Sequence, residues 1–121
     1  MEIVQEVIGD GEHPVVRIAP QGRLDAVTVP SLETVLQEHL DAGHVQLVVD
    51  LSGVSYLSSS GLRALLRARR QAQSGKGDVV LSSMTPRVRE IFDMVGFTTL
   101  FNVFDSAADA AAWFTSVHSP G

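Results

Sequence analysis

The chain has 121 residues, a length that fits one domain with its own hydrophobic core. Hydrophobic residues make up 45% and charged residues 19%, a globular composition that excludes a largely disordered chain. The net charge of −5 argues against direct binding to nucleic acid, and the absence of cysteine excludes disulfides and thiolate chemistry. Residues 1–4 lack signal-peptide features and no apolar run could span a bilayer, so we expect a cytoplasmic protein without a membrane partner.

Strand and helix patterns alternate along the chain. Val- and Ile-rich runs predict strands, and apolar residues three or four positions apart predict helices. In order, we expect strands at 2–8 and 15–19, a helix from the possible cap Thr28 to Gly43, a strand at 45–51, a helix after Gly61, a strand at 78–81, a helix from Thr85-Pro86 to Gly96, a strand at 100–104 and a helix capped by Asp105 or Ser106.

The order β-β-α-β-α-β-α-β-α predicts the fold class. Alternating strands and helices favour an α/β fold with a mixed, mostly parallel sheet. We expect about five strands, with the first hairpin at the sheet edge, and about four helices. One domain should span residues 1–118, followed by a disordered tail at 119–121. Four side chains near the third helix should fill the core or cover a helix end: Phe92, Met94, Phe97 and Phe101.

Catalytic and metal-binding patterns are missing. No phosphate-binding glycine motif occurs. A G-x-S-x-G elbow is also absent, because no glycine precedes the serines at the position that this motif requires. The histidines are His13, His39, His44 and His118, and none has a second histidine or a carboxylate at helical ligand spacing. We therefore expect surface histidines, no metal, no cofactor and no enzymatic activity.

The most informative segment is the serine turn, which we define as Ser58, Ser59, Ser60 and Gly61. It lies between a buried strand and a helix, and functional loops of α/β sheets gather at the carboxyl ends of strands. Three interpretations are open from the residues alone. The serines could cap the helix, form an anion or phosphate site at its N-terminus, or supply a nucleophile, although no base is in evident reach.

Two further features point to the same region. Arg63, Arg67 and Arg70 are spaced to form a basic stripe on the second helix, which is either a solvated face or a docking surface for an acidic partner. Asp25 follows the second strand, where it either caps the first helix or lines the same sheet end as the serine turn.

Three separated segments resemble one known family, the STAS domain, which is the fold of bacterial anti-sigma factor antagonists. Residues 50–62 resemble its signature segment, residues 22–25 resemble its G-x-L-D element, and residues 85–97 resemble its third helix. The resemblance covers essentially the whole chain in order. It implies a STAS-like single domain.

The resemblance also implies a mechanism. In such antagonists, the unphosphorylated protein binds an anti-sigma factor with serine kinase activity and so frees a sigma factor for transcription. The kinase phosphorylates a serine that matches Ser60, the partners separate, and a serine phosphatase reverses the step. Ser58 stands where the family usually has Asp, which leaves Ser59 and Ser58 as alternative modification sites.

The family resemblance and the basic stripe together predict a set of partner-binding residues: Asp25, Ser58, Ser59, Gly61, Arg63 and Arg67. The alternative is a STAS interaction module of a signalling scaffold, or a transport-system accessory subunit, without phosphorylation switching.

Overall fold

The computed structural model describes residues 1–9 and 14–117, so the predicted tail at 119–121 lies outside the described residues. Seven strands, four α-helices and one short 3-10 helix are present in this part of the chain. They are β1 (Ile3–Val7), β2 (Val16–Pro20), β3 (Gly22–Leu24), α1 (Val29–Asp41), β4 (Gln46–Asp50), β5 (Val54–Leu57), α2 (Ser59–Ser74), β6 (Asp78–Ser82), α3 (Pro86–Met94), η1 (Phe97–Thr99), β7 (Val103–Phe104) and α4 (Ala107–Val117).

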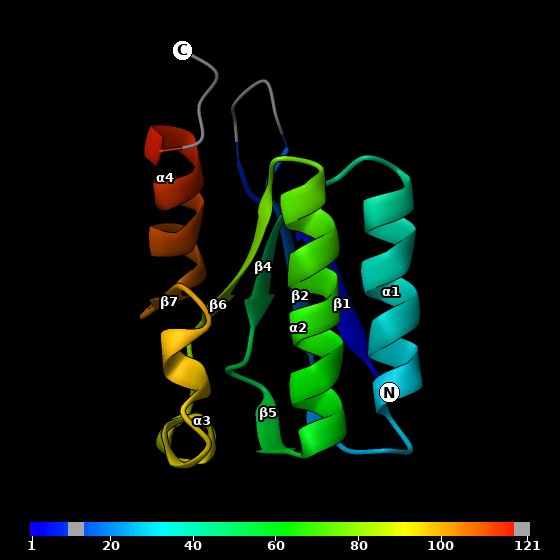
Figure 1. Cartoon of the computed structure of the whole chain (residues 1–121), viewed down its shortest axis with the longest axis vertical. Coiled ribbons are helices and arrows are strands. Elements are labelled where there is room, and N and C mark those ends of the chain that lie inside the picture. Colours follow the sequence, from blue (N-terminus) through cyan, green and yellow to red (C-terminus); the bar gives the residue numbers. More distant parts are fainter. Residues whose placement is uncertain (10–13, 118–121) are drawn as a thin grey trace.

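The main sheet has five strands in the order β1-β2-β4-β6-β7 (Figure 1). β1 pairs antiparallel with β2 at one edge, and every other pairing in this sheet is parallel. The predicted mixed, mostly parallel sheet of about five strands, its edge hairpin and its four helices are therefore confirmed.

Helices cover both faces of this sheet, which explains why β4 is buried at every position. Leu47 and Val49 of β4 lie in the larger core cluster with residues of α1, α2 and α3. Val48, which points to the opposite face, packs with Ala110 and Phe114 of α4. The near-continuous apolar run of this strand is what two-sided burial requires.

Two short strands were missed by the sequence prediction. β3 and β5 form a separate two-stranded parallel sheet beside the main one. β3 has three residues and β5 has four, and each pairs with a segment about thirty residues away in sequence. Local sequence patterns therefore do not reveal the pairing. This small sheet matters because both of its strands end at the predicted functional region.

Two predicted element boundaries were also wrong. The last strand includes only Val103 and Phe104, because only these two residues of the predicted strand at 100–104 pair with β6. Helix α2 begins at Ser59 rather than after Gly61, so the serine turn belongs to its first turn. The final helix is capped by Ser106, whose Oγ accepts a hydrogen bond of 3.1 Å from the Asp109 N–H.

Candidate functional site

The serine turn begins α2 at the end of the molecule where β3 and β5 stop (Figure 1). Ser58 is the residue before the helix, and its extended backbone lets its Oγ accept a long hydrogen bond of 3.5 Å from the Gly61 N–H. The capping interpretation is therefore correct for Ser58. A serine at this position keeps the helix cap that an aspartate would also provide, without the negative charge.

The other two hydroxyl groups are free to react. Ser59 is exposed and Ser60 is partly exposed. Neither hydroxyl has a hydrogen-bond partner among the residues that the structure describes. Both lie in the first helical turn, where the macrodipole and the backbone N–H groups favour a negative charge.

Gly61 lets this turn pack tightly against the small sheet. A Cβ atom at Gly61 would lie 2.7 Å from Cδ1 of Leu57 and 3.5 Å from Cβ of Leu24. Leu57 and Leu24 are buried and pair with each other at the ends of β5 and β3. The glycine therefore fixes how closely the start of α2 approaches both strand ends.

Asp25 lies next to the serine turn. Leu24 and Leu57 are register partners, so the residues that follow them, Asp25 and Ser58, leave the small sheet side by side. The Ser58 N–H donates a hydrogen bond of 2.8 Å to the Leu24 carbonyl oxygen, which joins the two segments directly. The structure thus brings together Asp25 and the serine turn, as the shared-sheet-end interpretation predicted.

Asp25 also holds the turn that leads into α1, but its side chain bonds none of the described residues of that helix, so only the shared-sheet-end interpretation of this residue holds. Its Oδ1 accepts hydrogen bonds from the N–H groups of Val27 at 3.0 Å and Thr28 at 3.2 Å. The hydrogen bond from the Thr28 N–H lowers the pKa of Asp25, which keeps the carboxylate ionised. Thr28, the predicted cap, makes no side-chain cap bond; its Oγ1 donates instead to the Arg23 carbonyl oxygen at 2.6 Å.

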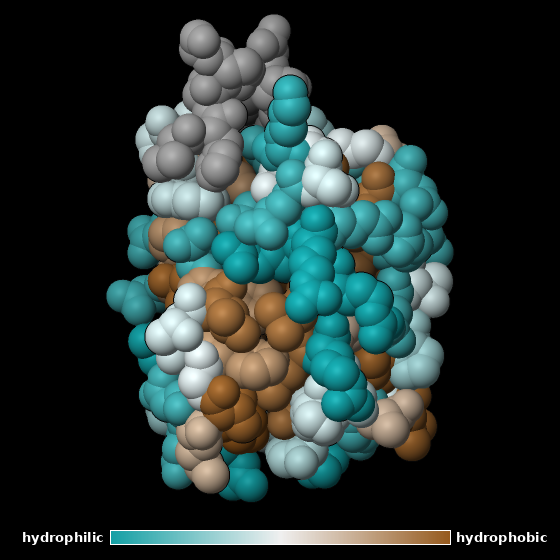
Figure 2. Space-filling model, viewed as in Figure 1, coloured by the Kyte–Doolittle hydropathy of each residue, from teal (hydrophilic) through white to brown (hydrophobic). Residues whose placement is uncertain are grey.

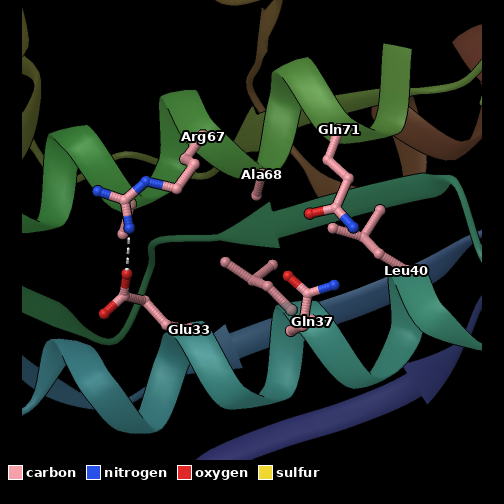
Figure 3. Close-up of a pocket in the computed structure, with 8 residues that line it drawn as sticks. Glu33, Gln37, Leu40, Arg67, Ala68 and Gln71 are labelled. Atoms are coloured by element: carbon pink, nitrogen blue, oxygen red, sulfur yellow. Dashed lines mark hydrogen bonds and ion pairs between the residues drawn. The ribbon is translucent and has the colours of Figure 1, made fainter. Parts of the chain in front are cut away.

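The predicted basic stripe is only partly a free surface. Arg67 reaches across the groove between α2 and α1 and forms an ion pair of 2.8 Å with Glu33 (Figure 3). Arg63 and Arg70 are exposed and form no ion pair within the described residues. The pairing of Arg67 was missed because Glu33 comes from another helix. Arg63, one turn beyond the serines, remains the free cation nearest to them in this stripe.

Two apolar side chains, one in the loop after β3 and one in α3, are strongly exposed. Val27, in the loop after β3, is 87% exposed, and Met94, at the end of α3, is 80% exposed. Met94 therefore does not fill the core, whereas Phe92 and Phe101 are buried as predicted. Figure 2 shows an apolar area beside the hydrophilic side chains of α2, toward the segment formed by α3 and η1. The α3 helix packs against β5, which carries the turn.

The described histidines lie elsewhere. His39 and His44 are in contact at the end of α1, whereas the serine turn lies at the end of the molecule where α1 starts (Figure 1). His13 and His118 lie outside the described residues. No group of three or more His, Cys, Asp or Glu side chains suitable for a metal ion occurs in 1–9 and 14–117. Within the same ranges, no helix has the length and apolar character that crossing a bilayer demands.

Comparison with known proteins decides the family. The model of the STAS domain matches residues 6–110, which include both strands of the small sheet and the serine turn. The chain belongs to the STAS domain family. The chain is 37% identical over 94 residues to BtrV of Bordetella bronchiseptica, a protein named as an anti-sigma factor antagonist. The match covers 78% of this chain and 81% of BtrV.

Solved STAS structures are similar in fold. An anti-sigma factor antagonist from Mycobacterium paratuberculosis superposes with a TM-score of 0.76 at 26% identity, and the match covers 92% of each chain. The anti-sigma factor antagonist SpoIIAA in its unphosphorylated form also gives a TM-score of 0.76, covering 94% of this chain and 98% of its own. Its identity of 19% supports the shared fold alone.

Proposed function

We propose that this STAS domain is an anti-sigma factor antagonist controlled by phosphorylation of the serine turn. Without phosphate, it binds an anti-sigma factor that has serine kinase activity, and the sigma factor is released for transcription. Phosphorylation at Ser60 ends this binding, and a serine phosphatase restores the binding form. The observation that carries this proposal is a serine hydroxyl in the first turn of α2 that lacks a hydrogen-bond partner in the described part of the chain and lies beside the ionised Asp25.

Ser60 is the preferred target among the three serines. The hydroxyl of Ser58 is already engaged as the helix cap, where it accepts a hydrogen bond of 3.5 Å from the Gly61 N–H. Ser60 and Ser59 have no hydroxyl hydrogen bond within residues 1–9 and 14–117, and Ser60 is the residue that the family resemblance assigns. Ser59 is the first alternative because it is exposed, and Ser58 is the second.

A phosphate here would change the surface that a partner contacts. It adds about −1.5 to −2 charges at neutral pH, and the N-terminus of α2 tolerates them well. The new charge would lie beside the Asp25 carboxylate, whose pKa is lowered by its hydrogen bond from Thr28. The helix therefore stays folded, while the surface around the turn becomes strongly negative. An acidic partner surface would be repelled by this charge, and an apolar one could pack here only at the cost of removing water from the phosphate.

The partner surface that we propose surrounds the serine turn. It contains the apolar side chain of Val27, two residues after Asp25, and the cation Arg63. Apolar contacts would supply affinity, and Arg63 would steer an acidic partner. Arg67 contributes less than predicted because Glu33 already neutralises it.

The role we propose is non-catalytic and cytoplasmic. A serine nucleophile needs a base within hydrogen-bond reach, and the two described histidines lie at the opposite end of α1. The alternative is a STAS interaction module of a signalling scaffold or transport system that is not switched by phosphorylation. The following experiment separates it from our proposal.

The experiment uses the partner kinase captured with the purified chain. Incubation of the chain with that kinase and ATP should add one phosphate by intact mass, located at Ser60 by fragmentation. Ser60→Ala should abolish it, and the matched control Ser59→Ala should retain it. Absence of added phosphate on the wild-type chain would refute the switch, and phosphate on Ser59 in the wild type would move the site by one residue.

A further inference from the structure

The end of α1 places two histidines in contact. Gly43 has a positive φ of +85°, and its N–H donates to the Leu40 carbonyl oxygen at 3.0 Å. The next N–H, of His44, donates to the His39 carbonyl oxygen at 2.9 Å. This pair of bonds is the Schellman motif, in which the residue after the glycine comes back over the last helical turn. Its side chain therefore meets that of His39, five positions earlier.

The two imidazoles present their Nδ1 atoms to each other. These atoms lie 3.1 Å apart, with ring centroids separated by 5.4 Å and the rings tilted by 34°. On the other side of its ring, His39 Nε2 lies 2.8 Å from Oε1 of Gln5 in β1. An amide oxygen only accepts, so His39 Nε2 carries a hydrogen and, in the neutral ring, Nδ1 has a free lone pair.

We propose that His39 and His44 bind a divalent ion of the late first-row transition metals, such as Zn²⁺, through their Nδ1 atoms. Two nitrogens that bind one tetrahedral Zn²⁺ at ~2.0–2.1 Å are about 3.3 Å apart, close to the 3.1 Å observed here. Imidazole is a preferred ligand of Zn²⁺, Cu²⁺ and Ni²⁺. Water completes the coordination.

Binding needs a proton shift and a rotation of the two rings, because the Nδ1 atoms now point almost directly at each other and must instead point at one ion beside the line that joins them. Without metal, His44 Nδ1–H donates to the lone pair of His39 Nδ1. On binding, the hydrogen of His44 moves from Nδ1 to Nε2, so both Nδ1 atoms offer lone pairs and the net charge of the rings is unchanged. His39 already has the arrangement of metal-bound histidines, whose second nitrogen donates to an oxygen that fixes the ring.

The surroundings favour a cation at this position. The pair lies at the C-terminal end of α1, where the helix dipole stabilises positive charge. Glu38 and Asp41 add two carboxylates to the same helical turn. Partial burial and the neighbouring His44 lower the pKa of His39, which favours the neutral imidazole that binds metal. Both rings remain partly exposed, so an ion can reach them.

A bound metal ion would link three segments of the chain. His39 belongs to α1, His44 to the loop before β4, and Gln5 to the edge strand β1. An ion that binds the folded chain but not the unfolded one raises the melting temperature with its concentration. This effect lies at the opposite end of α1 from the serine turn, so it does not depend on the proposed phosphorylation switch.

The test is calorimetric titration of the chelator-treated full chain with Zn²⁺. We expect one ion per chain, with His39→Gln and His44→Gln each weakening binding at least tenfold. Gln5→Leu should weaken it about tenfold or more, because Gln5 orients the His39 ring. His13→Gln removes another histidine and should bind Zn²⁺ as the wild type does. Equal affinity of the wild type and the His39→Gln/His44→Gln double variant would overturn the site.

A second measurement guards against misfolded variants. In nitrogen-15 spectra of the imidazole rings of the wild-type chain, Zn²⁺ should shift the Nδ1 signals of His39 and His44 together. The melting temperature should rise with Zn²⁺ in the wild type but not in His44→Gln. Shifts confined to other histidines, or an equal rise in both chains, would overturn the proposal.

Discussion

The backbone N–H of Ser58 donates a 2.8 Å hydrogen bond to the carbonyl oxygen of Leu24. This bond joins the segment that holds the serine turn to the segment that holds Asp25. The turn and the aspartate are more than thirty residues apart in sequence, and the parallel pairing of β3 with β5 makes them neighbours. A change of charge on one therefore acts directly on the surface formed by the other.

The cap of α2 can be tested at Ser58. Ser58→Ala removes the Oγ that accepts from the Gly61 N–H, and we expect the free energy of unfolding to fall by about 1 kcal/mol. Ser58→Asp should recover that loss, because aspartate caps as well and its charge suits the helix N-terminus. Urea unfolding measures both. Ser59→Ala is the matched control and should unfold like the wild type; equal losses at Ser58 and Ser59 would contradict the assigned cap.

Asp50 should make stability depend on acid pH. Burial by itself raises the pKa of Asp50, but hydrogen bonds from the Ser52 N–H and the Arg17 guanidinium outweigh it and lower the pKa below 3.8. The folded chain therefore binds the proton more weakly than the unfolded chain. The stabilising effect of the ionised Asp50 carboxylate is complete above about pH 5. It disappears as the pH falls through 3.8 and then through the pKa of Asp50 in the folded chain.

Asp50→Asn should remove this pH dependence. We expect it to lower the free energy of unfolding by about 2 kcal/mol at pH 7, and by less at pH 3. Urea unfolding at both values measures the difference. Glu6→Gln is the control, since Glu6 pairs with the same Arg17 but is half exposed and should change stability by less than about 0.5 kcal/mol. A loss for Asp50→Asn that is the same at both pH values would be inconsistent with the assigned pair.

Arg63 should steer the association with an acidic partner. Arg63→Glu should slow association about tenfold at low salt, and the difference should shrink as salt is added. Stopped-flow mixing with the captured partner measures this rate. Arg70→Glu makes the same charge change about 10 Å further along α2 and should have the smaller effect. If Arg63→Glu associates as fast as the wild type at low salt, the charge plays no part in docking.

Val27 should contribute affinity rather than stability. Because it is 87% exposed, Val27→Ser should leave the free energy of unfolding within about 0.5 kcal/mol of the wild type. Loss of an apolar contact at a partner surface should nevertheless weaken binding about tenfold. Val7→Ser is the control, since Val7 is 64% exposed on the edge strand β1. Similar binding by both variants would place Val27 outside the partner surface.

Much of the fold could be predicted from local patterns. The helices were recognised because their buried residues recur at helical spacing, and β4 because a strand covered on both faces is continuously apolar. β3 and β5 could not be recognised in the same way. They are short, and each owes its structure to pairing with the other, a contact that no local pattern records.

The sequence predicts where the site lies better than it predicts the side-chain contacts around it. Ser58 as a cap and Asp25 beside the turn agree with the sequence-based interpretation. The pairing of Arg67 with Glu33 depends on how two helices pack, which the spacing of arginines on one helix does not contain. Helical spacing does not reveal the contact of His39 with His44, because residues five apart do not face each other on a helix. The Schellman end at Gly43 brings together residues five apart, and its glycine was visible in the sequence.

The central claim is that a phosphate in the serine turn ends partner binding. The direct measurement is the affinity of the captured partner for the unphosphorylated chain and for the same chain phosphorylated at Ser60, in the absence of ATP turnover. We predict tight binding of the unphosphorylated form and a loss of at least a hundredfold with phosphate, while circular dichroism shows the fold unchanged. Equal affinity of the two forms would contradict the account.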